Sequence, residues 1–254
     1  MVVASLVGAA AVVYARRWRQ APDANRWRAL SFAAACTTIL AAAQGPLSAL
    51  GEERLALAHV VMLILLIHVA PFFVVRAITP AILGPRAATV ARGLGGLPVA
   101  VPLVLLAGVA YAWHLPPVFD AAASNAWLAG LQHASFVVVG VIAWQPIGGH
   151  PDLRVPLRGL TAFLYVTGDE LLLGALGIVL TWAPGPLYDV YVDAPRTWGL
   201  SADTDQMLAG AVLTVVEEGP MAIALAVVFI RMLERDEREL RAQERALDAR
   251  QGRR

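Results

Sequence analysis

Seven separate apolar stretches divide this chain, and most of them are long enough to cross a bilayer as a helix. They lie at about residues 2–15, 29–50, 55–78, 97–115, 125–145, 159–182 and 205–231. Apolar residues make up 58% of the chain, charged residues only 15%, and the mean hydropathy is +0.64, which is typical of bilayer proteins. A spanning helix needs about 20 residues. We therefore predict an all-α, polytopic membrane protein with seven transmembrane helices in one domain, residues 1–231.

The basic residues predict the orientation of these helices. All 20 are arginines, and the segments after the first, third, fifth and seventh stretches hold five, three, two and eight of them. The alternate connections hold only Arg54 and Arg196. By the positive-inside rule, the N-terminus lies outside and the C-terminus in the cytoplasm. The first stretch has its arginines after the apolar run, so we expect a retained helix rather than a cleaved signal peptide.

Residues 232–254 are predicted to form a charged, cytoplasmic helical tail. Glu234 with Arg238, and Glu237 with Arg241, have the spacing of ion pairs on one helix face. Such a tail acts either as a solvated stop-transfer segment or as a docking arm. The net charge of +1 does not suggest nucleic acid as a partner.

Histidines from three different stretches are expected at one level, close to the outer surface. Imidazoles at such a depth commonly bind a metal, relay a proton or pair with a carboxylate. A thioether three residues after the first histidine shares its helix face, and another opens the seventh stretch. Imidazole and thioether together suit copper, particularly Cu(I); alternatively, the histidines bind water or cap backbone carbonyls. The candidate metal ligands are His59, Met62, His114, His133 and Met207.

A second polar layer is predicted near the midplane. Its members are His68, Asp169, Glu170, Glu217 and Glu218. His68 follows His59 by nine residues, so it is expected on the opposite helix face. Intramembrane carboxylates usually face inward, and these form either a proton or ion path or a set of interhelical hydrogen bonds.

The external connections are aromatic and rich in proline. Trp113–Ala122 reads WHLPPVFDAA, and Ala183–Gln206 contains two tyrosines and Trp198. Aromatic residues are expected at this level as interface anchors. Their concentration on the outer side is also consistent with a lid or a docking surface over the histidines.

Several ordered stretches resemble a known family. They are HVVMLILLIHVAP from His59, AWHLPPVFDAA, AWLAGLQHASFVVVGVIAWQPI, PGPLYDVY and TWGLSADTDQMLAG, running from about residue 55 to 215. In these stretches the chain is similar to the CtaG-type cytochrome c oxidase assembly factors, heptahelical proteins of bacterial membranes.

The resemblance implies a multi-pass protein of the bacterial inner membrane. Its function would be maturation of a haem–copper oxidase at the copper-delivery stage, with oxidase subunits as partners and without enzymatic turnover. The resemblance implies the motif positions His59, His114, His133, Asp205 and Gln206. In this interpretation Asp205 and Gln206 are polar groups behind the metal ligands, and Asp205 orients an imidazole.

The chain departs from the family pattern in two places. The family's third helix resembles H-x-x-Q-H, whereas here Met62 and Leu63 follow His59 at the last two places. A W-x-P-G stretch of the seventh helix is replaced by Val216–Pro220, which adds two carboxylates. A thioether at Met62 would substitute for the lost ligand.

A small transporter or channel for protons or metal ions, working through the midplane carboxylates, is the second hypothesis. The two halves of the chain show no convincing repeat, which weighs against it. The chain has no lysine for a retinal Schiff base, and no spacing typical of a hydrolase nucleophile or a phosphate loop. Cys36 is its only cysteine, which excludes an internal disulfide.

Overall fold

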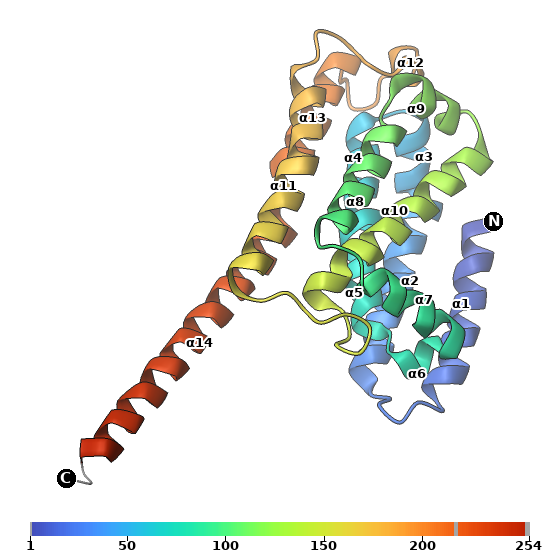
Figure 1. Ribbon diagram of the computed structural model, residues 1–254. Coiled ribbons are helices and arrows are strands. Elements are labelled where there is room, and N and C mark those ends of the chain that lie inside the picture. Colours follow the sequence, from blue (N-terminus) through green and yellow to red (C-terminus); the bar gives the residue numbers. More distant parts are fainter. Residues whose placement is uncertain (1, 216–217, 252–254) are drawn as a thin grey trace.

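The computed structural model describes residues 2–215 and 218–251, and within these ranges the chain is helical and has no β-strand. The helices form an elongated bundle, from which the last helix projects (Figure 1). Short helices connect the longer ones at both ends of the bundle. In chain order the elements are α1 (Val2–Trp18), α2 (Arg26–Gln44), α3 (Pro46–Glu53), α4 (Ala56–Ile64), the π-helix η1 (Leu65–Val69), α5 (Ala70–Ala77), α6 (Pro80–Leu83), α7 (Pro85–Gly95), α8 (Ala100–Trp113), α9 (Pro116–Ala123), α10 (Ala126–Gly148), α11 (Gly159–Trp182), α12 (Asp189–Val192), α13 (Ala202–Val215) and α14 (Glu218–Gln251).

Several helices have the length and composition of membrane spans. Three qualify by themselves: α4–η1–α5 taken as one helix (Ala56–Ala77), α10 and α11. Two bent pairs, α2 with α3 (42°) and α7 with α8 (98°), raise the number to five when each pair is counted as one span. Large apolar side chains such as Leu171 and Trp182 on α11 are exposed, as expected for a surface in contact with lipid. The prediction of an all-helical membrane protein is confirmed; the count of seven spans and the orientation of the termini stay predictions.

The connections at one end of the bundle are rich in arginine, and those at the other end are not. We call the two ends the α12 end, which holds α9 and α12, and the α6 end, which holds α6 and α7 (Figure 1). Hydrogen bonds join the arginine-rich connections at the α6 end: Arg17 donates to Leu83 O, Arg28 to Arg76 O (3.3 Å) and Arg154 to Leu97 O (3.2 Å). Three connections that are far apart in sequence therefore meet at one end.

A bend between α2 and α3 interrupts the second predicted stretch. Gly45 caps α2, and Pro46 begins α3. Proline has no N–H to donate to the preceding turn, so a helix bends or restarts there. The bend brings α3, with Ser48 and Glu52, to the α12 end.

The third predicted stretch contains a π-helical turn at its centre. The N–H of Ala70 donates to Leu65 O, and Pro71 has no N–H for the carbonyl of Ile67. Gly140 of α10 packs against this place, because a Cβ built on it would lie 2.2 Å from Ile67 O. The missing side chain at Gly140 thus permits close packing of α10 against the π-helix.

Glycines also allow α11 and α13 to approach closely. A Cβ on Gly177 would lie 2.3 Å from Thr214 Oγ1, and one on Gly210 would lie 2.5 Å from Gly177 O. Paired small residues at four-residue spacing are a common interface between membrane helices. This contact fixes α13, whose first turn reaches the α12 end.

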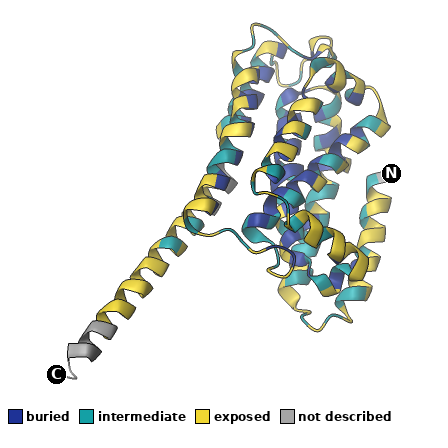
Figure 2. Cartoon of the chain, in the orientation of Figure 1, coloured by how far each residue is buried: buried dark blue, intermediate teal, exposed yellow. Residues whose placement is uncertain are grey.

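Helix α14 leaves the bundle and carries the predicted charged tail (Figure 2). The predicted ion pairs are present: Arg238 with Glu234, and Arg241 with Glu237, each at 3.0 Å. The helix runs without a break through residues 231 and 232, so the charged tail is a direct continuation of the preceding helix. Glu217 and the side chain of Glu218 lie outside the described residues.

The substitution Gly140→Ala is expected to destabilise the bundle, because the new methyl group would meet Ile67 O and, at 2.6 Å, Pro71 Cγ. Overpacking of this kind costs about 1–3 kcal/mol, so the apparent melting temperature in detergent, followed by tryptophan fluorescence, should fall. The control Gly130→Ala lies on the same helix with nothing within 4 Å, and it should be neutral or stabilising. Equal losses in both variants would contradict the close contact.

Candidate functional site

The structure brings the three histidines that were predicted near the outer surface together as buried groups. His59 lies one turn into α4, His114 directly follows α8, and His133 lies in α10. Each is at most 6% exposed. The rings of His59 and His114 meet edge to face, with centroids 5.8 Å apart, and His59 is within electrostatic range of both other imidazoles.

Four nitrogens of these rings are buried without a hydrogen-bond partner: both nitrogens of His59, Nε2 of His114 and Nε2 of His133. Unpaired buried polar atoms cost about 1–3 kcal/mol each, so proteins seldom keep them without a reason. His114 Nδ1 lies 2.7 Å from Ala110 O. A carbonyl only accepts, so Nδ1 donates and, in the neutral ring, Nε2 holds the lone pair. The cluster therefore offers several lone pairs to a ligand.

His133 also faces an acid. Its Nε2 is 3.6 Å from Glu52 Oε1, which accepts a hydrogen bond from Ser48 (2.5 Å). The distance to Glu52 exceeds that of an ordinary hydrogen bond. Glu52 is thus a polar neighbour of the cluster that the sequence did not single out.

The two candidate thioether ligands differ in environment. Met62 is fully buried in α4, on the helix that carries His59, whereas Met207 is 46% exposed on α13. Among the residues that the structure describes, no group of three or more histidine, cysteine, aspartate or glutamate side chains has a ready arrangement for a metal ion. Any ion bound here would require the side chains to adjust.

Three aromatic rings cover the histidine pair. The Phe119 centroid lies 4.6 Å from that of His59 and 6.0 Å from that of His114, and its other neighbour is Tyr188, stacked at 3.9 Å. Tyr191 completes the group, 5.7 Å from Phe119. These residues, which we call the aromatic cover, are all buried. Trp198, on the connection that carries Tyr188 and Tyr191, is 71% exposed, as expected for an interface anchor.

Hydrogen bonds hold the aromatic cover in place. Tyr188 donates to His114 O (3.3 Å), and Tyr191 donates to Gly51 O. Burial raises the pKa of both phenols, so each remains a neutral donor. The cover is thereby joined to the segments that carry His114 and lead into α4.

Asp205 caps the helix that carries His59. Its Oδ2 accepts from Ala56 N (2.6 Å) and its Oδ1 from Leu57 N (3.2 Å). The residue at the N-cap position, Leu55, provides no side-chain acceptor. Asp205 therefore positions His59 through the backbone of α4. The sequence predicted that Asp205 orients an imidazole directly, whereas these two hydrogen bonds go to the amides of Ala56 and Leu57.

Two other polar side chains fix the segment before the aromatic cover. Gln206 accepts from Leu187 N (2.7 Å) and donates to Gly185 O (3.1 Å). Asp120 of α9 accepts from the first amides of α12, Asp189 N (3.3 Å) and Val190 N (3.2 Å). Gln206 was expected behind the ligands, whereas Asp120 was missed, although it lies in the quoted HLPPVFDAA stretch.

The family model described as cytochrome c oxidase caa3 assembly factor (Caa3_CtaG) matches residues 9–235, most of the chain. The chain belongs to this family. No curated protein and no solved structure matches it. The resemblance seen in the sequence is therefore confirmed. The matched range includes the segments that form the α12 end.

The predicted midplane residues lie deeper in the caa3 assembly factor fold. His68 is buried within the π-helix, Asp169 is buried in α11, and Glu170 beside it is half-buried. Each of these three has an interaction partner. They are therefore engaged in the bundle.

The substitution Asp205→Ala is expected to loosen the start of α4, because it leaves the amides of Ala56 and Leu57 without an acceptor. Loss of a helix cap costs about 0.5–2 kcal/mol, so hydrogen–deuterium exchange of residues 56–60 should accelerate. Asp203→Ala removes an exposed carboxylate from the same turn of α13 and should leave exchange unchanged. Unchanged exchange in Asp205→Ala would contradict the capping role.

Proposed function

We propose that this protein helps to assemble a caa3-type cytochrome c oxidase by holding a copper ion among His59, His114 and His133, for delivery to the oxidase. Family membership supports the assembly role. The observation that supports copper is the set of buried imidazole nitrogens without partners. Oxidase subunits are the proposed partners, and the α12 end is the face they would approach.

The donor set suits a soft or borderline metal ion. Imidazole nitrogen and thioether sulfur favour copper over magnesium or calcium. His114 would bind through Nε2, because Nδ1 is held by Ala110 O. His59 and His133 would supply the other nitrogens and Met62 the thioether. When bound, the ion supplies no catalysis; it is the cargo that the oxidase requires.

The residues around this set exclude water and fix its geometry. The aromatic cover shields the rings of His59 and His114, while Asp205 holds the start of α4. Release of an ion would require the segment with α12 to move away from His114. The hydrogen bonds of Asp120 and Tyr188 are the contacts that would have to break.

For the topology, we propose seven spans in a bacterial inner membrane. The N-terminus and the α12 end would lie outside, and the α6 end and the α14 tail in the cytoplasm. The gathering of the arginine-rich connections at the α6 end supports this orientation.

Copper binding is expected to depend on the three outer histidines. Detergent-purified protein reconstituted anaerobically with Cu(I) should retain close to one equivalent by elemental analysis. The variant His59→Ala, His114→Ala, His133→Ala should retain almost none, and Met62→Leu should bind more weakly. Asp203→Ala should bind as the unaltered protein does. Equal copper in the triple variant, or none in the unaltered protein, would overturn the proposed site.

In cells, the same histidines should be needed for the oxidase. A strain that lacks this protein, complemented with His59→Ala and His114→Ala together, should show caa3 oxidase activity no higher than the uncomplemented strain. Complementation with Asp203→Ala should restore activity. Excess copper in the medium should partly rescue the histidine variant, because it bypasses delivery. Normal activity in that variant without added copper would exclude delivery through this site.

A further inference from the structure

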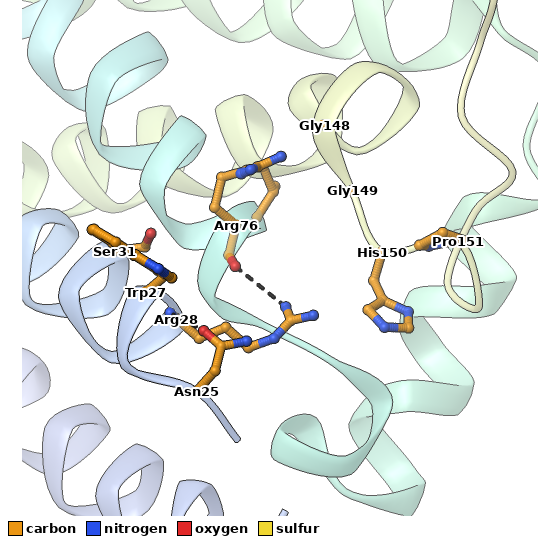
Figure 3. Close-up of a pocket in the computed structure, with 10 residues that line it drawn as sticks. Asn25, Trp27, Arg28, Ser31, Arg76, Gly148, Gly149, His150 and Pro151 are labelled. Atoms are coloured by element: carbon orange, nitrogen blue, oxygen red, sulfur yellow. Dashed lines mark hydrogen bonds between the residues drawn. The ribbon is translucent and has the colours of Figure 1, made fainter. Parts of the chain in front are cut away.

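A second polar site lies at the α6 end, away from the histidine cluster. A pocket of about 300 Å³ opens between the start of α2, the end of α5 and the segment after α10 (Figure 3). This volume is at the lower end of the usual range for ligand pockets, about 300–1,000 Å³. The ten residues that line it are Asn25, Trp27, Arg28, Ser31, Val75, Arg76, Gly148, Gly149, His150 and Pro151.

The polar lining consists of donors and positive charge. Two arginines and a histidine contribute, and the ten described residues around the pocket include no carboxylate. Two acids lie close to the lining: Asp23, at 4.0 Å from Arg28, and Asp152, at 3.9 Å from His150; Asp152 is largely exposed. The pocket therefore favours an anionic ligand.

Arg28 is held at the pocket with hydrogen-bonding capacity to spare. Its Nη1 donates to Arg76 O (3.3 Å), so the guanidinium extends across the pocket towards His150 (Figure 3). Its Nε is buried and has no partner. His150 Nδ1 accepts from Asp152 N (3.2 Å), so in the neutral ring Nε2 carries the proton and can donate.

The rim of the pocket has the character of a membrane interface. Trp27 is 66% exposed, with Arg26 over its ring at 5.2 Å, and Leu30, one turn along α2, is also exposed. Tryptophan is enriched at the level of the lipid headgroups. A dissolved anion needs only the polar lining, whereas a phospholipid would also cover the apolar rim.

We infer that this pocket binds the headgroup phosphate of an anionic phospholipid. Arg28 and Arg76 provide the charge, Arg28 Nε and His150 Nε2 donate to phosphate oxygens, and Trp27 with Leu30 contacts the glycerol and acyl chains. Basic pockets between membrane helices are a known means of anionic lipid binding. The site is separate from the proposed copper site, so either can fail without the other.

The test uses the full chain, purified and delipidated in detergent, with binding measured by native mass spectrometry. Phosphatidylglycerol should bind in preference to phosphatidylcholine with the same acyl chains. Arg76→Gln should weaken phosphatidylglycerol binding about tenfold, as expected for one charge-assisted contact. This variant keeps the backbone carbonyl that accepts from Arg28, so folding is preserved. Arg28→Gln should weaken binding at least as much.

The control is Arg86→Gln, which removes an exposed arginine of α7 outside the pocket. It should bind as the unaltered protein does. Equal binding of the two lipids, or equal weakening by Arg86→Gln and Arg76→Gln, would overturn the inference. Inorganic phosphate distinguishes the two sources of the ligand: displacement of the lipid by phosphate at equal concentration would identify a site for a free anion and overturn the lipid assignment.

Discussion

The carboxylate of Asp205 accepts hydrogen bonds from the first amides of α4, and the α12 end is arranged around this contact. The early amides of a helix have no partner within the helix. Here Ala56 is only 5% exposed, so water cannot readily satisfy its N–H, and Leu55 has no acceptor to offer. A residue 149 positions later in the chain provides one. Because Gly177 and Gly210 fix α13 against α11, the contact also fixes His59 relative to the rest of the bundle.

Two acids close to the histidine cluster bind backbone amides, which leaves several imidazole nitrogens without a hydrogen-bond partner. Asp205 and Asp120 accept hydrogen bonds from backbone amides. In these contacts their carboxylates do not pair with a histidine ring. The ring of Phe119 packs against those of His59 and His114. The alternative role suggested by the sequence, capping of backbone carbonyls, applies to one nitrogen only, His114 Nδ1. The four unpaired nitrogens would be costly in a purely structural cluster. A neutral imidazole has one lone pair, so each of the three rings can offer one nitrogen to a soft cation.

The sequence predicted the helices better than the contacts between them. The stretches 55–78, 125–145 and 159–182 agree closely with α4–η1–α5, α10 and α11, because apolar length is a local property. The π-helix could have been suspected from Pro71, but its position depends on packing against Gly140. Asp205 was singled out in the sequence, yet its partners, the amides of Ala56 and Leu57, could not be known without the position of α13. The aromatic connections were predicted to cover the histidines, but the stacking of Phe119 on Tyr188 was not, since these residues are distant in sequence and meet only after folding.

The candidate span Ala56–Ala77 shows how one charge rule operates at both ends of the molecule. The N–H groups at the start of a helix attract negative charge, and the carbonyls at its end attract positive charge. At the α12 end, Asp205 from α13 satisfies the start of α4; at the α6 end, Arg28 from α2 donates to the carbonyl of Arg76, in the last turn of α5. The helix that carries His59 is thus stabilised at each end by a side chain from another helix. Arg28, one of the arginines that predict the orientation, therefore also donates to a carbonyl at a helix end. A substitution at Arg28 would destabilise the same helix as a substitution at Asp205, at its opposite end.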